Sequence, residues 1–250
     1  MKKNKKRVVL TIGGFDPSGG AGVLADFQVL QKLKVPSVHA ITANTYQVAA
    51  KFLSYRAVSA KELSEQLKAL LGAYEPVVVK IGMLGSVKLV DVLLKFVRAC
   101  HPRIVIWDPI WRASAGPYLI DVKNFSPELK KLLLVVNLWI PNLPEAKWIL
   151  GKNFPKEENP ILIAKLLYPI LSPQKSLQKA VILKGGHLPG EPIDVLYDGE
   201  KIYQSGGKRL KGKFHGSGCR FASSLAGHLF LDESLFQAVK LSKNLFTSKN

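Results

Sequence analysis

Short apolar runs alternate with longer amphipathic stretches along this chain, and no other feature of the sequence limits the fold as strongly. The runs have the length of buried strands, and the stretches between them have the spacing of helices. This order predicts an α/β fold with a mainly parallel central sheet. The predicted strands are Val8–Ile12, Ser37–Thr42, Val77–Ile81, Ile104–Trp107, Leu134–Ile140 and Ala180–Lys184. The predicted helices are Gly22–Leu33, Ala60–Leu71, Val87–Ala99, Pro144–Leu150, Pro160–Leu171, Ser217–Phe230 and Glu233–Phe246.

The remaining stretches add a hairpin and few breaks. Asp198-Gly199 stands between two alternating runs, which predicts two antiparallel strands joined by a tight turn. Gly151–Asn159 and Pro173–Lys179 are polar and contain proline, so we expect the flexible stretches there. With 250 residues and no internal repeat, the chain is expected to form a single domain over residues 1–250.

Cysteine use and hydropathy indicate a reducing compartment and no membrane partner. Cys100 and Cys219 are the only cysteines and do not form a disulfide framework. The apolar run after the basic start, Val8–Ile12, is too short for a signal peptide. No apolar stretch approaches the ~20 residues needed to span a bilayer. We therefore expect a cytoplasmic protein.

The formal net charge of +18 has two interpretations. It could mark a surface for nucleic acid or membranes, or a solvated basic face that also attracts phosphorylated ligands. Apart from Lys2–Arg7 and Lys208–Lys213 the lysines are scattered, and no aromatic RNA-binding signature accompanies them. The second interpretation is therefore favoured, and nucleic acid is not the expected partner.

Two glycine-containing stretches resemble nucleotide motifs without fulfilling them. GAGVLA, within Gly13–Gly22, matches a dinucleotide fingerprint, but no acidic residue follows about 20 positions later to hold a ribose. GKRLKGKF, Gly207 to Phe214, has the spacing of a phosphate loop, but Phe214 stands where a serine or threonine would bind Mg²⁺. A basic loop describes it better.

A third glycine turn is better placed to bind an anion. Gly216-Ser217-Gly218 opens an amphipathic helix, and free N–H groups at a helix N-terminus attract negative charge. A glycine-rich helix entry without any ligand is the alternative.

Seven motifs occur in the order in which a known family carries them: VLTIGGFDPSGGAGVLADFQVLQKLKV, VKIGMLGS, WDPIW, IPNLPEA, VILKGGHL, DVLYDG and HGSGC. From about Val8 to Phe246 the chain thereby resembles the hydroxymethylpyrimidine and phosphomethylpyrimidine kinases. The resemblance implies a ribokinase-like three-layer α/β/α sandwich that uses ATP and Mg²⁺ to phosphorylate the hydroxymethyl pyrimidine precursor of thiamin and its monophosphate. Such kinases are often dimeric, so a homodimer is also implied.

The resemblance assigns residues to the nucleotide half of the site. Gly216, Ser217 and Gly218 would supply backbone donors to the transferred phosphoryl group. The other candidates follow predicted strands, where ligands bind in open α/β sheets: the carboxylates Asp108 and Glu145 for Mg²⁺, Asn142 in the N-x-x-E element, and Lys184 for the nucleotide phosphates. The alternatives are a turn residue for Asp108, a first-turn helix carboxylate for Glu145 and a surface lysine for Lys184.

The resemblance makes Cys219 the candidate base. Its position at a helix N-terminus predicts a pKa below the ordinary value of about 8.5, so that partial thiolate accepts the alcohol proton. The alternative is a small buried apolar residue.

Five further positions match the pyrimidine site of the family: Gly14, Asp26, Gln47, Met83 and Ile110. The Gln47 amide can both donate and accept, which matches an aminopyrimidine edge. Met83 and Ile110 would form apolar walls for a flat ring.

Three departures from the family pattern fall near the expected site. The loop after Asp108 has Ser114-Ala115-Gly116 in place of Lys-Ser-Gly, so one cation is missing. Arg220 replaces the usual threonine after the cysteine and could restore that charge. TYQVAA keeps Gln47 but loses the Asn-Thr pair that usually follows it.

Two other functions compete with this one. A pyridoxal kinase on the same scaffold is the first, although Gln47 and the Lys184-Gly-Gly-His187 element favour the pyrimidine. A non-catalytic binding module that uses the basic surface is the second. The complete set of polar candidates argues against it.

Overall fold

The computed structural model describes residues 5–48, 51–113, 117–171, 179–186, 191–206 and 216–244. Its strands are β1 Lys6–Phe15, β2 Ser37–Val48, β3 Lys51–Ala57, β4 Tyr74–Ile81, β5 Ile104–Trp107, β6 Leu138–Trp139, β7 Ala180–Leu183, β8 Ile193–Tyr197 and β9 Ile202–Gly206. Its α-helices are α1 Gly22–Lys32, α2 Ala60–Ala73, α3 Val90–Cys100, α4 Pro127–Leu132, α5 Leu143–Leu150, α6 Pro160–Leu167, α7 Ser217–Phe230 and α8 Leu235–Asn244. Short 3-10 helices are η1 Val87–Leu89, η2 Gly151–Asn153 and η3 Tyr168–Leu171.

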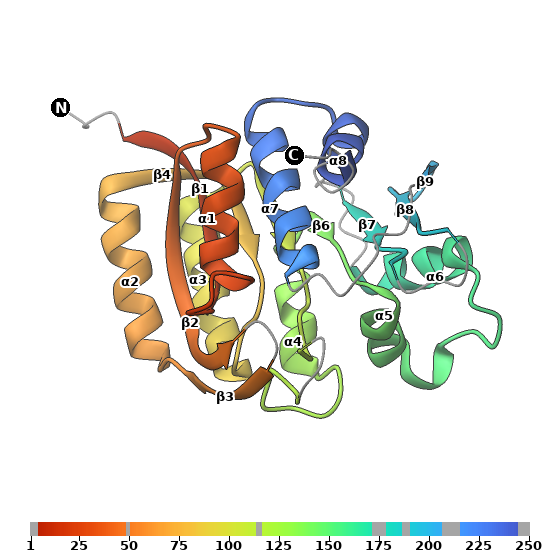
Figure 1. Cartoon of the computed structure of the whole chain (residues 1–250), viewed down its shortest axis with the longest axis horizontal. Helices are drawn as coiled ribbons and strands as arrows, with labels where there is room; N and C mark the ends of the chain where they lie inside the picture. The colour runs from red at the N-terminus through yellow and green to blue at the C-terminus, as the bar shows by residue number, and fades with distance from the viewer. Residues whose placement is uncertain are drawn as a thin grey trace.

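All described strands form one sheet in the order β3-β2-β1-β4-β5-β6-β7-β8-β9. The pairs from β2 through β7 are parallel, while β3 at one edge and β8 and β9 at the other are antiparallel. Helices α2 to α6 cover one face of the sheet, and α1, α7 and α8 cover the other (Figure 1). The expected three-layer α/β/α sandwich is confirmed.

The burial of β1 explains why its sequence is apolar without alternation. Every residue from Val8 to Gly14 is buried, because Leu10 and Ile12 face one helical layer while Val9 faces the other. A parallel strand covered on both faces has no polar side. Helix α2, in contrast, lies at the surface and buries Leu63 and Leu67 on one stripe.

Most predicted elements are confirmed, with differences at particular ends. The predicted strand Leu134–Ile140 shrinks to β6, because the chain from Leu132 to Val135 still turns out of α4. The predicted helix Glu233–Phe246 begins at Leu235, and its end lies outside the described residues. Most of the stretch expected to be flexible near Pro173 also lies outside them, as does the basic loop after Gly207.

Two elements were missed. Strand β3 is an edge strand with a mostly exposed pattern, so it has no apolar run to mark it. Helix α4 has only six residues, begins with Pro127 and is capped by Ser126. The hairpin at Asp198-Gly199 is confirmed as β8 and β9, and the Asp198 carboxylate accepts N–H groups from Glu200 and Lys201.

An aromatic cluster packs beside β5 and β6. Trp107 stacks on Trp139 with ring centroids 6.0 Å apart, and Phe125 stacks on both. Trp111 stacks on Trp148 at 4.9 Å, and Phe125 meets Trp148 edge-on. All four tryptophans of the chain therefore belong to one cluster.

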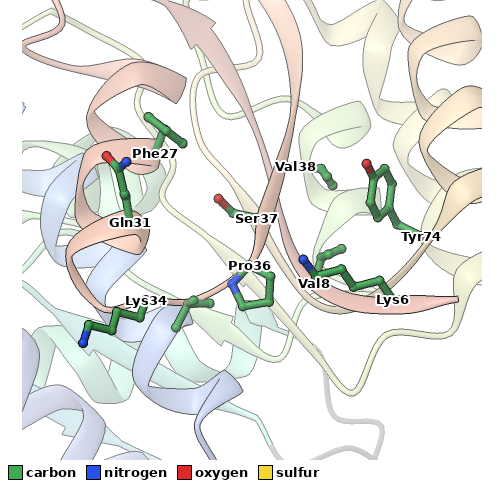
Figure 2. A pocket seen from close by; sticks show the side chains of 10 residues that line it. Lys6, Val8, Phe27, Gln31, Lys34, Pro36, Ser37, Val38 and Tyr74 are labelled. Atoms are coloured by element: carbon green, nitrogen blue, oxygen red, sulfur yellow. The ribbon is translucent and has the colours of Figure 1, made fainter.

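A hollow of about 620 Å³ lies at the amino ends of the strands, and Figure 2 shows the side chains that line it. Lys6, Ser37 and Tyr74, which begin β1, β2 and β4, line it together with Phe27 and Gln31 of α1. Ligands of open α/β sheets bind at the opposite, carboxyl ends. This hollow is therefore not the expected site.

Within the part of the chain that the structure describes, no helix is both long and apolar enough to cross a bilayer.

Candidate active site

The candidate residues gather at the carboxyl ends of the parallel strands. Gly14 is the next-to-last residue of β1. Met83 follows β4, Asp108 follows β5, and Lys184 follows β7. Asn142 follows β6 and pairs in parallel with Lys184, whose backbone N–H donates to the Pro141 carbonyl at 2.9 Å. The predicted strand ends therefore do bring these side chains to one edge of the sheet.

Lys184 lies between the two candidate metal-binding carboxylates. Its Nζ donates to Asp108 Oδ1 at 2.6 Å and lies 3.7 Å from Glu145 Oε2. Burial alone would lower the pKa of Lys184, but the two carboxylates outweigh burial and hold this pKa above its ordinary value. Lys184 is thus a cation bound inside the site, and the surface-lysine alternative is wrong.

Asn142 and Glu145 form the first turn of α5. The Asn142 Oδ1 accepts the Glu145 N–H at 2.9 Å, and Glu145 Oε2 accepts the Asn142 N–H at 2.7 Å, which is a capping box. The alternative for Glu145, a first-turn helix carboxylate, is therefore confirmed. The capping bonds also orient the carboxylate toward Lys184. One side chain can therefore both cap α5 and contribute to the polar site.

Burial raises the pKa of Glu145 to about 7, although Lys184 opposes the shift. Between the ordinary value of 4.5 and about 7 the folded state holds more protons than the unfolded state, so stability falls as pH rises through this window. We expect Glu145→Gln, which keeps the capping bond, to raise the free energy of unfolding by about 1–3 kcal/mol at pH 8 and to change it little near pH 5.

Urea unfolding at both pH values measures this effect. Glu128→Gln is the matched control, because Glu128 is an exposed first-turn carboxylate of α4 whose pKa is lowered by the Ser126 hydroxyl. The control should not gain stability at pH 8. Equal stability of wild type and Glu145→Gln at pH 8 would contradict the prediction.

The carboxylates fit Mg²⁺ better than a metal held by protein alone. Asp108 Oδ2 is buried, and no described group hydrogen bonds to it. No cluster of three or more histidine, cysteine or acidic side chains suited to a metal occurs among the residues described. Mg²⁺ keeps several waters and is held by one or two carboxylates plus substrate phosphates. Asp108 and Glu145 match that requirement.

The first turn of α7 lies against the same two groups. A Cβ atom placed on Gly218 would lie 3.4 Å from Lys184 Nζ and 3.7 Å from Asp108 Oδ2. Gly216 has φ +75°, and a Cβ there would lie 2.0 Å from the Gly20 carbonyl oxygen. The glycines thus let the helix N-terminus approach both the cation and the loop after β1, and the helix dipole favours an anion there.

We expect Gly216→Ala to destabilise the protein by more than 1 kcal/mol, because it combines a positive φ with a backbone clash. Gly72→Ala is the control, since nothing lies within 4 Å of its Cβ and alanine suits helix α2. That control should gain about 0.5–1 kcal/mol. Thermal unfolding of both variants measures the difference, and a neutral Gly216→Ala would contradict the close approach.

Cys219 is buried at the start of α7, and here the sequence prediction of its pKa is wrong. Burial raises the pKa of the Cys219 thiol to about 11, although Lys80 acts to lower it. The loss of hydration therefore outweighs the favourable charges. Cys219 as the base stays a prediction, and it needs the charges around the thiol to change on ligand binding.

Three pyrimidine candidates form an apolar corner. A Cβ on Gly14 would lie 2.9 Å from Met83 Sδ, and Met83 and Ile110 belong to one cluster with Ala43 and Leu119. Gln47 is half-buried on β2, and its amide Nε2 donates to the Thr45 hydroxyl at 2.9 Å. The bond to Thr45 engages the Nε2 group of the amide. Among the described residues the amide oxygen has no hydrogen bond, so this oxygen remains for a ligand.

Asp26 is bound by interior side chains. Its carboxylate is fully buried, and both oxygens accept hydrogen bonds from Lys80 Nζ, at 3.0 and 2.9 Å. The Ser223 hydroxyl donates to Asp26 Oδ1 at 2.6 Å. Asp26 therefore holds the interior beneath the site, and its direct contact with a pyrimidine stays a prediction. Lys80 and Ser223 were missed by sequence reasoning.

A comparison of the sequence with protein families decides the assignment. The family model described as phosphomethylpyrimidine kinase matches residues 16–249. The chain belongs to the phosphomethylpyrimidine kinase family.

Individual relatives agree with the family. The hydroxymethylpyrimidine/phosphomethylpyrimidine kinase of Aquifex aeolicus (strain VF5) is 30% identical over 96% of this chain and 92% of its own length. The phosphomethylpyrimidine kinase of Clostridium difficile 630 superposes with a TM-score of 0.77 at 28% identity, over 97% of this chain and 98% of its own. A pyridoxal kinase of Staphylococcus aureus in complex with ADP superposes with a TM-score of 0.81 at 25% identity, over 98% and 87%.

One departure from the phosphomethylpyrimidine kinase pattern can be located. The Arg220 guanidinium donates to Gln28 Oε1 at 2.8 Å and reaches the Gly19 carbonyl at 3.5 Å, so it binds α1 and the loop after β1. Its role as a replacement for the missing phosphate-binding cation stays a prediction. Ser114–Gly116 and His187 lie outside the described residues.

Asp16 is another residue that sequence reasoning missed. The carboxylate is buried and accepts the Ser18 hydroxyl at 2.8 Å and the backbone N–H groups of Ser18 and Ala21, both at 2.9 Å. These bonds shape the glycine-rich loop that precedes α1. The Asp-Pro-Ser signal of a side-chain-bonded turn is present in the sequence and could have identified it.

Proposed function

We propose that this chain transfers the γ-phosphoryl group of ATP to the hydroxymethyl group of 4-amino-5-hydroxymethyl-2-methylpyrimidine, and then phosphorylates the resulting monophosphate. The observation that carries the proposal is the meeting of Lys184 Nζ, Asp108 Oδ2 and the Gly218 backbone at the start of α7. Phosphoryl transfer depends mainly on positioning and on stabilisation of charge. A cation, a carboxylate suited to a metal and a helix N-terminus at one point supply both.

The nucleotide end would work through these groups. The Lys184 ammonium group would bind the β- and γ-phosphates in addition to the two carboxylates. Asp108 and Glu145 would hold Mg²⁺, which neutralises phosphate charge when bound. The N–H groups of Ser217 and Gly218 would stabilise the charge on the transferred group, because the α7 N-terminus carries no side-chain cap.

The acceptor end would use Cys219 and the apolar corner. Gly14, Met83 and Ile110 would hold the pyrimidine ring, and the Gln47 amide would bind its amino edge. Cys219 would accept the proton of the hydroxymethyl group as its oxygen attacks the γ-phosphorus in line. In the second phosphorylation the acceptor is a phosphate oxygen, which is already ionised near neutral pH and needs no base.

ADP release with Mg·ATP tests the proposal, with the hydroxymethyl pyrimidine, its monophosphate and pyridoxal as parallel acceptors. Turnover on both pyrimidines and little on pyridoxal is the expected result. Turnover mainly on pyridoxal would replace the proposal with the second candidate, and no turnover on any acceptor would remove the kinase function.

A pyridoxal kinase is that second candidate, because the superposition on the Staphylococcus aureus pyridoxal kinase has a TM-score as high as that on the pyrimidine kinase. The shared scaffold therefore does not decide the acceptor. Gln47 supports the pyrimidine, since a methionine is common there in pyridoxal kinases.

We also propose a cytoplasmic homodimer. Cys100 and Cys219 are both free thiols, which suits a reducing compartment. At the β2–β3 edge Tyr46, Val48 and Leu53 are exposed, with Leu53 at 63%, and an apolar edge strand is a surface that proteins usually cover.

Light scattering should give a dimer for the wild type and a monomer for Leu53→Glu. Leu231→Glu is the control, because Leu231 is an exposed leucine beyond α7, and this variant should remain a dimer.

A further inference from the structure

Lys80 is a charged residue in the middle of the sheet. It lies in β4, where its neighbours Val79 and Ile81 are fully buried, and its own side chain is 1% exposed. A lysine is almost never so buried unless it is paired. Its place is not explained by the strand alone, because an apolar residue would pack there without a charge to neutralise.

The ammonium group links three elements beneath the candidate site. Lys80 Nζ binds both oxygens of Asp26 on α1, and Asp26 in turn accepts the Ser223 hydroxyl of α7. Ser223 lies four residues after Cys219 on the same helix, so the two side chains share one face, with Cβ atoms about 5–6 Å apart. The chain of contacts therefore ends one helical turn below the thiol.

The charges that face Cys219 come from every side of this pocket of the interior. Lys80 contributes from β4 and Asp26 from α1, Asp108 follows β5, and Lys184 follows β7. The Gly22 backbone at the start of α1 also acts to lower the pKa of the thiol. Asp26 and Asp108 oppose a thiolate, whereas Lys80 favours it and is the strongest of the charges acting on the thiol.

We propose that Lys80 is a positioning residue of the phosphoryl-transfer site: held by Asp26, which Ser223 holds in turn, its ammonium group keeps a fixed positive charge beneath Cys219 and stabilises the thiolate there. The proposal rests on the proposed function in giving Cys219 the part of the base. Lys80 itself touches no substrate. Because its position is fixed by two bonds to Asp26 on α1, which α7 holds in turn through Ser223, the charge needs no rearrangement when the proton moves.

The test follows the thiol rather than turnover. Cys100→Ser leaves Cys219 as the only thiol of the chain, and the rate of alkylation by iodoacetamide against pH then gives its titration midpoint, because the thiolate is the reactive form. Lys80→Gln removes the charge and keeps a hydrogen bond to Asp26. Its midpoint should rise by about one unit or more, which lowers the alkylation rate roughly tenfold at a fixed pH below the midpoint.

Two further variants separate charge from packing. Lys80→Arg keeps the charge and should stay within about half a unit of wild type. Lys179→Gln is the matched control: Lys179 is another buried lysine, but it donates to the Leu133 and Leu171 carbonyls and forms no ion pair within the described residues. Its midpoint should not move.

If Lys80→Gln does not fold, Lys80→Met combined with Asp26→Leu replaces the whole pair with apolar side chains, a change that cores often tolerate. Lys80 favours the thiolate and Asp26 opposes it, so a midpoint that still rises in this double variant assigns the effect to the lost ammonium charge. A midpoint unchanged in every folded variant that lacks Lys80, or one that rises equally in Lys80→Arg, overturns the proposal. Since alkylation needs no substrate, these outcomes are independent of whether the pyrimidines are phosphorylated.

Discussion

Cys219→Ala is expected to lower kcat for phosphorylation of the hydroxymethyl pyrimidine by about a hundred- to ten-thousandfold, the usual contribution of a general base. The second phosphorylation should fall far less, because its acceptor oxygen is already ionised near neutral pH. Burial raises the pKa of this thiol to about 11, so the first reaction should also speed up as pH rises from 7 to 9. Rates with each acceptor, measured separately at saturating ATP, give the comparison.

Cys100→Ala is the control for this experiment. Cys100 ends α3, and its thiol is bonded only to the Val97 carbonyl in the contacts described. Both reactions should keep their wild-type rates in that variant. Equal losses of the two reactions in Cys219→Ala would show that the side chain acts through packing, and the assignment of the base would have to be withdrawn.

Asp108→Asn should produce the second large loss, about a hundred- to a thousandfold in kcat with either pyrimidine. Asparagine keeps the shape of the side chain and can still accept the hydrogen bond from Lys184, so the protein should fold. The lost charge removes half of the carboxylate pair suited to Mg²⁺. The concentration of MgCl₂ that gives half-maximal rate should therefore rise at least tenfold.

The matched control is Asp198→Asn, which changes a half-buried carboxylate in the turn between β8 and β9, away from the candidate site. It should leave both kcat and the Mg²⁺ requirement unchanged. An Asp108→Asn enzyme with the Mg²⁺ dependence of wild type would mean that Asp108 serves only as the partner of Lys184 in the folded protein.

The order of strands and helices could be predicted because each core strand of the parallel sheet is an apolar run in the sequence. The observed strands lie within a few residues of these runs. β5 was predicted with its observed bounds, and α7 likewise. Strand β3 could not be found, since its register is set by pairing with β2 and its side chains are mostly exposed. Tertiary pairing, rather than local pattern, defines that edge.

The candidate site was predictable to the extent that its residues follow strands. Asp108, Glu145 and Lys184 do lie together, because neighbouring parallel strands end at one edge. The burial of Cys219 was not predictable, since a helix N-terminus in a sequence does not reveal how deeply it is packed. Lys80 was missed for a related reason: one lysine in an apolar run gives no sign of an acidic partner 54 residues earlier.

The tryptophan cluster allows ligand binding to be followed by intrinsic fluorescence. Trp107 immediately precedes Asp108, and Trp148 lies three residues after Glu145 on α5, so the indoles border the nucleotide half of the site. The four indoles form two stacked pairs, Trp107 with Trp139 and Trp111 with Trp148, which Phe125 joins into one cluster. Intrinsic emission should therefore respond when a charged nucleotide arrives. Nucleotide affinity could then be titrated without a label, even in variants that have lost all turnover.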